Sequence, residues 1–227
     1  MLAYGNLSKL GLVIGLGAAL LGGASGPVQA GEANASAVAG QEAPQDNPAP
    51  VAAIDALYAE LLGVMREGRQ LGAEGRYRKL EPVVDRTFNL PLMTQVAVGS
   101  RWSSLSGDQQ AKLIEAFRRF TIASYANHFD DFGGQRFEVL PQTQSLQGGT
   151  MVLSKLVLRD RKKPIDLNYV MRETNGQWQV IDVYAEGTIS ELARRRSEFG
   201  AVLTRSGVDA LADRLVERAQ TLLNQPA

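Results

Sequence analysis

The stretch KPIDLNYVMRETNGQWQVIDVYAEG, Lys163 to Gly187, decides the fold. Two runs rich in apolar and aromatic residues lie on either side of Asn175-Gly176, a dipeptide typical of a two-residue type I′ turn. The stretch therefore predicts a β-hairpin in which Thr174 pairs with Gln177.

The turn sets the register of the hairpin, since each step away from it pairs one residue of each strand. Opposed residues share a face, and the expected pairs are Glu173 with Trp178, Met171 with Val180, Tyr169 with Asp182, and Leu167 with Tyr184. The other face still carries Val170, Ile181 and Val183. A sheet with water on one side would alternate more cleanly, so we expect both faces to be covered.

The hairpin ends a longer run of strands. Alternation with a period of two predicts strands at residues 136–140, 150–158, 165–172 and 177–184. Their connections are short, which favours antiparallel neighbours in a curved four-stranded meander.

Helices are expected on both sides of the meander. Before it, apolar spacing and capping residues predict a helix at 51–68, a shorter one ending near 88, one from Asn89 to Gly99, and a long one that begins at a Ser106–Gln109 capping box. After it, Thr188 with Glu191 and Ser206 with Asp209 predict two more helix starts. Helices, then strands, then helices indicate an α+β fold.

The first 50 residues are expected to lie outside this fold. Residues 1–30 have the pattern of a cleavable signal peptide, because the apolar run Leu10 to Leu21 is too short to span a membrane, although an uncleaved anchor is the alternative. Residues 31–50 hold almost no large side chain and predict a flexible linker. One domain is then expected over 51–225.

Composition excludes several classes of function. The 227 residues include no cysteine and one histidine, which excludes disulfides and thiolate sites and leaves only scattered carboxylates as metal ligands. Lys and Arg total 24, as do Asp and Glu, so no global charge favours nucleic acid as a partner. No phosphate-binding glycine motif and no nucleophile elbow is present, and we expect no catalysis and no cofactor.

Three motifs resemble a known family. FNLPLM at 88–93 with Gly99 and Trp102, GQWQVIDV at 176–183 with Glu186-Gly187, and RSEF at 196–199 are similar to the signatures of the toluene-tolerance, or Mla phospholipid-binding, family. The resemblance runs in order from about Ala56 to Leu222. The segment EGTISELARRRSEF looks most like the branch named for hopanoid biosynthesis.

The resemblance implies a soluble periplasmic carrier that is not an enzyme. Its N-terminal helices, curved sheet and C-terminal helices would enclose an apolar cavity that holds a lipid, phospholipid or hopanoid, as cargo. It would act as a monomer that makes transient contact with inner-membrane and outer-membrane transport complexes, as an auxiliary component of an ABC transporter pathway.

On that hypothesis the cavity wall comes from the early helices, the long helix and the strands. The candidate lipid-binding residues are Leu90, Met93, Val96, Trp102, Phe117, Tyr125, Phe129, Phe137, Val139, Leu156, Leu167, Tyr169, Met171, Trp178, Val180 and Tyr184. Each could equally belong to a solid core, because protein interiors are normally close-packed. Met171→Glu or Val180→Glu is expected to leave a folded protein without lipid.

Two readings compete with the carrier. Asp182, expected beside Tyr169 on an apolar face, would have a raised pKa and could act as the general base of a small-molecule isomerase or lyase. A structural role for that carboxylate is the simpler interpretation, since a buried acid needs partners in any case. The other reading is a non-catalytic interaction domain with a filled core.

Two basic runs are candidate docking sites for a membrane or a partner complex. Arg161, Lys162 and Lys163 fall in a predicted loop, and Arg194, Arg195 and Arg196 fall on a predicted helix. Either run could meet anionic headgroups or an acidic protein surface, although a merely solvated face explains them as well.

Overall fold

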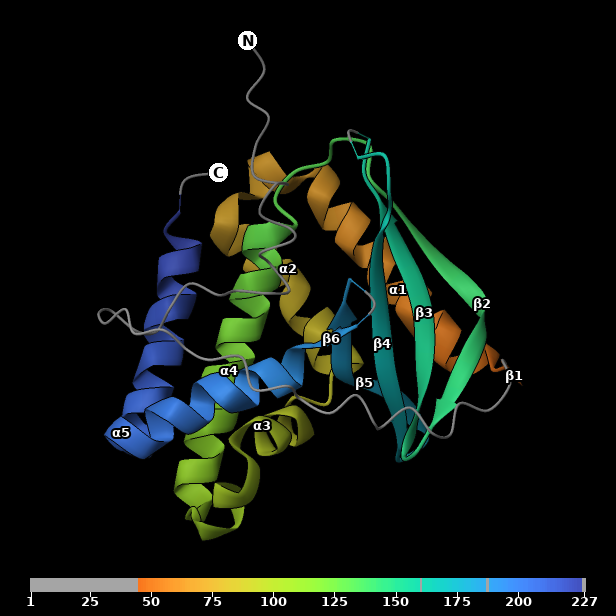
Figure 1. Cartoon of the computed structure of the whole chain (residues 1–227). Helices are drawn as coiled ribbons and strands as arrows, with labels where there is room; N and C mark the ends of the chain where they lie inside the picture. Colours follow the sequence, from red (N-terminus) through yellow and green to blue (C-terminus); the bar gives the residue numbers. More distant parts are fainter. Residues whose placement is uncertain (1–44, 160, 187, 226–227) are drawn as a thin grey trace.

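The computed structural model describes residues 45–225 except 160 and 187. One antiparallel sheet lies beside a group of helices (Figure 1). In chain order the elements are β1 (Gln45–Asp46), α1 (Pro48–Arg66), α2 (Gly68–Thr87), α3 (Leu90–Val98), the 3-10 helix η2 (Gly99–Ser104), α4 (Gly107–His128), β2 (Arg136–Leu146), β3 (Gly149–Val157), β4 (Ile165–Thr174), β5 (Gln177–Ala185), β6 (Ile189–Ser190) and α5 (Glu191–Leu223). The α+β class is as expected.

The sheet has six strands in sequence order, not four. The predicted meander corresponds to β2 through β5, although β2 continues from the expected end at residue 140 to Leu146, through residues that were expected to form a connection. A two-residue strand is added at each edge. Strands this short carry no alternation, so a periodicity argument misses them. β1 pairs Gln45 with Thr143, which places the start of the described fold inside the stretch predicted as linker. The expected signal peptide and residues 31–44 lie outside the described residues.

The turn of the predicted hairpin is confirmed, but its register is only partly so. Asn175 and Gly176 both have positive φ, 52° and 76°, as a type I′ turn requires. Pairing follows the prediction as far as Met171 opposite Val180. The register then shifts by one residue, because Ile181 has no partner and forms a β-bulge.

The bulge changes which side chains share a face. Beyond it, Tyr169 lies opposite Val183 and Leu167 opposite Ala185, so the expected pairs Tyr169–Asp182 and Leu167–Tyr184 are wrong. A single inserted residue reverses the facing of every later residue in the strand. Asp182 therefore shares a face with Val170, away from the buried side of the sheet.

Only one face of the sheet is fully covered. Ile165, Leu167, Tyr169 and Met171 of β4 are buried, and the residues between them are exposed or half-buried. The expectation that both faces are covered is therefore wrong. α1 and α4 both reach the buried face, since Tyr58 of α1 and Tyr125 of α4 each interact with Tyr169.

Of the helices before the strands, α3 and α4 begin where the sequence predicts, whereas α1 begins at Pro48, inside the expected linker, and α2, expected to be short, has 20 residues. Asn89 caps α3 by accepting from Leu92 N at 3.1 Å, and Ser106 and Gln109 form the expected capping box of α4. α1 is long and apolar enough to cross a membrane by length and composition alone. In the fold it is a core helix, with Ile54, Leu57 and Leu61 completely buried.

The C-terminal part has the two predicted helical segments, merged as α5, and differs from the prediction in the residue that caps the first. α5 is capped by Ser190, whose Oγ accepts from Ala193 N at 3.0 Å, and not by Thr188. It is interrupted at Gly207, with φ 81° and ψ −176°, next to the predicted start at Ser206.

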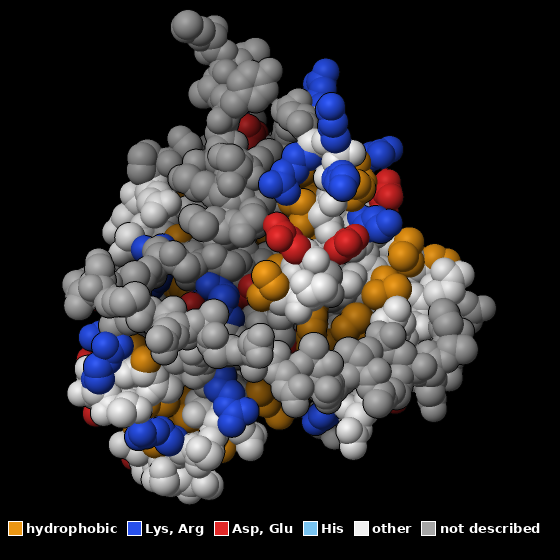
Figure 2. All heavy atoms as spheres, in the orientation of Figure 1, with side chains coloured by type: hydrophobic (Ala, Val, Ile, Leu, Met, Phe, Trp, Pro, Cys, Tyr) orange, Lys and Arg blue, Asp and Glu red, His pale blue; other side chains and the backbone are white. Residues whose placement is uncertain are grey.

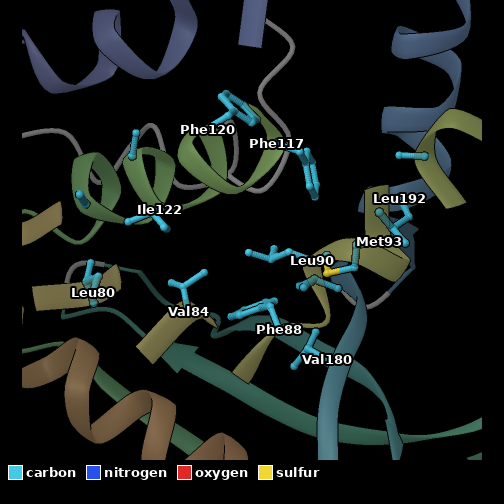
Figure 3. Packing of buried hydrophobic residues seen from close by; sticks show 14 of the residues in the cluster. Leu80, Val84, Phe88, Leu90, Met93, Phe117, Phe120, Ile122, Val180 and Leu192 are labelled. Atoms are coloured by element: carbon cyan, nitrogen blue, oxygen red, sulfur yellow. The ribbon is translucent and has the colours of Figure 1, made fainter. Parts of the chain in front are cut away.

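One continuous core joins the helices to the sheet. Figure 3 shows Phe88 close to Val180 of β5, and Phe117 of α4 directed towards Leu90 and Met93. The link between α2 and α3 is bonded directly to the sheet, because Asn89 N donates to Val180 O at 2.9 Å. This bond positions α3 beside the space between α4 and β5.

Candidate functional site

A pocket of about 90 Å³ lies between α4, the buried face of β4 and β5, and the start of α5. Most of its wall is apolar and much of it aromatic. The lining residues are Phe88, Met93, Phe117, Phe120, Thr121, Ser124, Tyr125, His128, Phe129, Leu167, Tyr169, Val183, Glu191, Leu192 and Arg195.

The pocket is smaller than the expected lipid-sized cavity. Pockets for drug-sized ligands measure roughly 300–1,000 Å³, and an engineered cavity of about 150 Å³ accepts benzene. At ≈ 90 Å³ this pocket has room for only a short piece of a hydrocarbon chain. The expectation of an enclosed space that is already large enough for a lipid is therefore corrected.

Aromatic rings fill the space between α4 and the sheet. Tyr125 and Phe129 of α4 have ring centroids 5.5 Å apart, and Phe129 lies 6.0 Å from Phe137 of β2. Phe137 in turn stacks on Tyr58 of α1 at 4.1 Å. Side chains alone therefore fill the space between α4 and the sheet, and a change of their rotamers would change the volume of the pocket.

Three phenols, those of Tyr58, Tyr125 and Tyr169, lie in the interior between the helices and the sheet. Ser154 Oγ donates its one proton to the Leu167 carbonyl, so the Tyr58 hydroxyl, 2.6 Å away, donates to Ser154. The Tyr169 ring meets the Tyr58 ring edge-on with centroids 5.9 Å apart, and Tyr125 lines the same pocket as Tyr169. Burial raises the pKa of Tyr125 and Tyr169 well above the usual value, so both rings stay neutral and can lie in an apolar wall.

A cluster of four charges stands at the α5 end of the pocket. Glu191 Oε2 accepts from Arg194 at 2.8 Å, and Glu198 accepts from Arg194 at 3.2 Å and from Arg195 at 3.3 Å. Burial raises the pKa of Glu191, and its bond with Arg194 opposes that shift. The Arg195 guanidinium lies over the Phe120 ring at 4.8 Å, and burial lowers its pKa.

The serine and histidine in the wall do not form a catalytic pair. Ser124 Oγ donates to Phe120 O at 2.7 Å, and His128 Nδ1 lies 2.5 Å from Ser124 O. Asp131 is paired with Arg69 at 2.7 Å. Within residues 45–225 that the structure describes, no three His, Asp or Glu side chains gather as metal ligands.

Asp182, the candidate general base, does not lie beside Tyr169 on the apolar face as expected. Its Oδ1 accepts from Val183 N at 2.8 Å and from Leu192 N at 3.1 Å, and its Oδ2 accepts from Ser190 Oγ at 2.5 Å. It does not line the pocket. The carboxyl holds the first turn of α5 on β5, which is a structural task.

The structure brings part of the predicted wall together. Met93, Phe117, Tyr125, Phe129, Leu167 and Tyr169 line the pocket. Leu90, Leu156, Met171 and Val180 are buried elsewhere in the core, while Trp102, Phe137, Val139 and Trp178 pack against it half-buried. Val96 is 42% exposed on α3, and Tyr184 lies on the far side of the bulge. That any of these candidate residues contacts lipid stays a prediction.

Other lining residues were not foreseen from the sequence. Phe120 follows Phe117 by one helical turn, so the periodicity of α4 contained that signal. Val183 faces the pocket only because of the bulge, and Glu191, Leu192 and Arg195 line it because α5 starts beside β5. No local pattern reports either arrangement.

The two basic runs lie in different environments: the first is exposed, and the second is partly buried. Arg161, Lys162 and Lys163 are exposed on the β3–β4 loop and line a shallow surface groove with Asp166 and Glu186. Figure 2 shows Lys and Arg side chains gathered at that end of the sheet. In the second run Arg195 is buried in the pocket wall and Arg194 is held by two glutamates, so that run is not a continuous docking surface.

Comparisons with known proteins agree with this architecture. The family model described as MlaC protein matches residues 55–217. A solved phospholipid-binding protein from Ralstonia solanacearum, in complex with a phospholipid, has a TM-score of 0.66 and 20% identity, over 76% of this chain and 98% of that one. A search of curated proteins found no significant match.

Proposed function

The chain belongs to the MlaC family, and we propose from this premise that it is a carrier that holds the apolar part of a lipid in the pocket between α4 and the sheet. The observation that carries the proposal is the aromatic pocket on the buried face of β4 and β5. A protein of the same fold is solved with a phospholipid bound.

The pocket wall suits a cargo that comes from a membrane. A lipid with about 30 methylenes would gain roughly 24 kcal/mol on leaving water, beyond the range of measured affinities. Transfer from a bilayer exchanges one apolar surrounding for another, so loading and release can stay close to balance. A carrier of this kind needs no cofactor and no nucleotide.

Loading requires the pocket to enlarge. We expect the rings of Tyr125, Phe129 and Phe137 to move apart, since these side chains fill the space between α4 and the sheet. The lost contacts between protein rings are replaced by contacts with the acyl chains or the fused rings of the lipid, so little buried apolar area is lost. The compact form would then be the lipid-free one.

The proposed cellular location and partners are those that the resemblance to the family implies. The protein would be exported to the periplasm by a signal peptide in residues 1–30 and would carry its cargo, phospholipid or hopanoid, between inner-membrane and outer-membrane complexes. The exposed Arg161–Lys163 loop is our candidate for contact with an anionic surface during transfer. We expect a monomer that is not an enzyme.

Organic extraction and mass spectrometry of protein purified from its natural host test the proposal. We expect about one lipid per protein from the wild type and several-fold less from Ser124→Leu, whose larger side chain would occupy the pocket. Ala111→Leu is the matched control, because it enlarges an exposed residue of the same helix. Circular dichroism checks that both variants fold.

Two outcomes would contradict the carrier. One is wild-type protein that releases no lipid and, after delipidation, takes none from phosphatidylcholine or phosphatidylglycerol vesicles. The other is a folded Ser124→Leu variant that carries as much lipid as the wild type, which would place the cargo elsewhere.

A further inference from the structure

The outer face of α3 carries no charged residue. The helix buries one side in the core, and the positions that it exposes are Pro91, Gln95 and Val96. Val96 is 42% exposed. A surface helix of a soluble protein normally presents charged residues to water on its outer face. The outer face of α3 therefore suits a surrounding that is less polar than bulk water.

The absence of acidic residues extends beyond α3. From Arg86 to Gly107 the sequence contains no Asp and no Glu. After α3, the 3-10 helix η2 carries Arg101 on the surface and Trp102 half-buried next to it, and the half-buried Leu105 follows. Trp, Leu and Arg are residue types with which proteins contact the headgroup layer of a membrane. The composition of this segment is therefore that of an interfacial surface.

Two exposed arginines, Arg101 and Arg196, give this part of the molecule a positive charge. Arg101 Nη2 donates to Thr204 Oγ1 at 3.0 Å. Arg196 of α5 packs on Gly99, where an added Cβ would lie 3.0 Å from Arg196 Nε. Among the residues that the structure describes, no carboxylate pairs with either arginine, whereas the two arginines that precede Arg196 in α5 are matched by glutamates. Both charges are therefore available to an anionic surface outside the protein.

This part of the molecule lies far from the basic β3–β4 loop. Figure 1 shows α3 at the lower end of the view and the β3–β4 loop at the upper end. In Figure 2, basic side chains adjoin hydrophobic ones where α3 meets α5. The groove at the loop contains Asp166 and Glu186, so its charge is mixed. On the inner side of α3, Met93 lines the pocket, so the two sides of this helix face the pocket and the exterior.

We infer that the α3 end, which we define as Val96, Arg101, Trp102, Leu105 and Arg196, docks on an anionic lipid bilayer. The two guanidiniums contact lipid phosphates, and Val96 enters the apolar layer directly beneath them. A bilayer offers both environments at one surface, whereas an acidic protein surface would match the arginines and leave Val96 against charge. The inference concerns docking alone and does not depend on lipid being bound in the pocket.

Flotation with lipid vesicles tests the inference. Purified protein is mixed with vesicles of phosphatidylglycerol and phosphatidylcholine in equal parts, or of phosphatidylcholine alone, and the fraction of protein that floats is measured. We expect the wild type to float with the anionic vesicles. Val96→Asp should lower the bound fraction about fivefold, because it places a charge in the apolar layer.

Phe132→Asp is the matched control for Val96→Asp and should bind as the wild type does. Phe132 is 37% exposed and follows the C-terminal end of α4, whereas η2 precedes its N-terminal end. The 22 residues of α4 span about 33 Å, so the control lies well away from the α3 end.

Charge reversal tests the two arginines. Arg101→Glu combined with Arg196→Glu should lower binding by about tenfold or more at low salt and by less at high salt. Arg66→Glu combined with Arg78→Glu is the control, because it makes the same change of net charge at exposed positions of α1 and α2. Circular dichroism checks that all four variants fold.

Fluorescence provides a measurement that leaves the α3 end unchanged. The chain has two tryptophans, so Trp102 is the only one in Trp178→Phe. Its emission should fall when anionic vesicles with brominated acyl chains are added, and not when the same lipids lack bromine. Bound protein whose Trp102 is not quenched would place the contact on another surface and refute the inference.

The remaining outcomes also decide the question. Wild-type protein that does not float with anionic vesicles would overturn the inference and leave an acidic protein surface as the partner of the arginines. Equal losses in the two arginine pairs would show that binding follows net charge alone. If the variants of the α3 end do not fold, the quenching of Trp102 decides. None of these results bears on the carrier, which lipid extraction tests.

Discussion

Asp182 holds the start of α5 against β5 through three hydrogen bonds, one from Ser190 and two from backbone amides. Burial raises the pKa of its carboxyl, and these three bonds only partly oppose the shift. The hydrogen bonds of Asp182 therefore fix α5 against β5, whereas its burial disfavours the charged form of the carboxyl.

We expect this raised pKa to appear in the pH dependence of stability. Because the folded-state pKa lies above the ordinary value of 3.8, the contribution of Asp182 is fully present below 3.8 and is lost as the pH rises through the folded-state pKa. The free energy of unfolding of the wild type minus that of Asp182→Asn should therefore fall with rising pH in urea titrations. Asp166→Asn, an exposed change on the same sheet, is the control. A difference that rises with pH would refute the argument.

Arg76 is a buried cation that completes the end of α4. It is 2% exposed, and its Nε donates to Ala126 O at 2.6 Å while Nη1 donates to Gly68 O at 2.8 Å. The last carbonyls of a helix lack partners within the helix, so Arg76 supplies one. The cation also lies favourably at the negative end of the helix dipole.

Arg76→Met should lower the free energy of unfolding by about 3 kcal/mol, because it leaves two buried carbonyls without donors. Chemical denaturation measures the effect. Arg78→Met removes an exposed arginine from the same helix and should change stability by less than about 0.5 kcal/mol. Equal effects of the two changes would show that the buried bonds contribute nothing.

Met171 and Val180 illustrate why a lining residue must be distinguished from a core residue. Both are completely buried outside the pocket, so the expectation that Met171→Glu or Val180→Glu leaves a folded carrier is replaced by one of unfolding. Far-ultraviolet circular dichroism should show loss of the native signal for Met171→Glu and its retention for Met171→Leu. A folded Met171→Glu protein would mean that the site is wetter than its burial indicates.

At the scale of the element, α5 contains two glycines whose replacement by alanine should have opposite effects on stability. Gly207 interrupts the helix with φ 81° and ψ −176°, a region that is essentially restricted to glycine. Gly200 lies within the regular part, and a Cβ would meet nothing within 4 Å at either position. Backbone conformation is thus the main difference between the two sites.

We expect Gly207→Ala to destabilise the protein by roughly 1–3 kcal/mol, through backbone strain. Gly200→Ala should stabilise it by about 0.5–1 kcal/mol, since alanine loses less conformational entropy in a helix. Urea denaturation of the two variants gives both values. The same sign for both changes would contradict the interruption at Gly207.

At the scale of the whole molecule, the pocket and the basic loop lie on different elements and can be tested separately. The pocket lies between α4, the sheet and α5, whereas Arg161–Lys163 belong to the β3–β4 loop. A docking role predicts that the loop affects transfer but not binding.

Reversing the charges with Arg161→Glu, Lys162→Glu and Lys163→Glu should slow lipid exchange with anionic vesicles several-fold at low salt, with less effect at high salt. Lipid bound per protein should not change. The control reverses three exposed arginines elsewhere, Arg78, Arg86 and Arg205. Equal exchange rates for the two triple variants would remove the loop from the docking surface.

The local features of the fold could be predicted because each depends on neighbouring residues. The Asn175-Gly176 turn, the caps at Asn89 and Ser106, and the long strands all follow from conformational preferences and short-range hydrogen bonds. The same reasoning identified part of the pocket, namely the apolar residues of α4 and β4.

The sequence by itself thus determined the α+β class, the order of the long elements and the family to which they correspond. Only the tertiary structure decided that Ile181 bulges, that Asp182 leaves the apolar face, and that Glu191 and Arg195 enter the pocket wall. The size of the pocket was likewise decided there, because packing depends on contacts between residues far apart in the chain, and no periodicity of a single segment records how closely two segments approach.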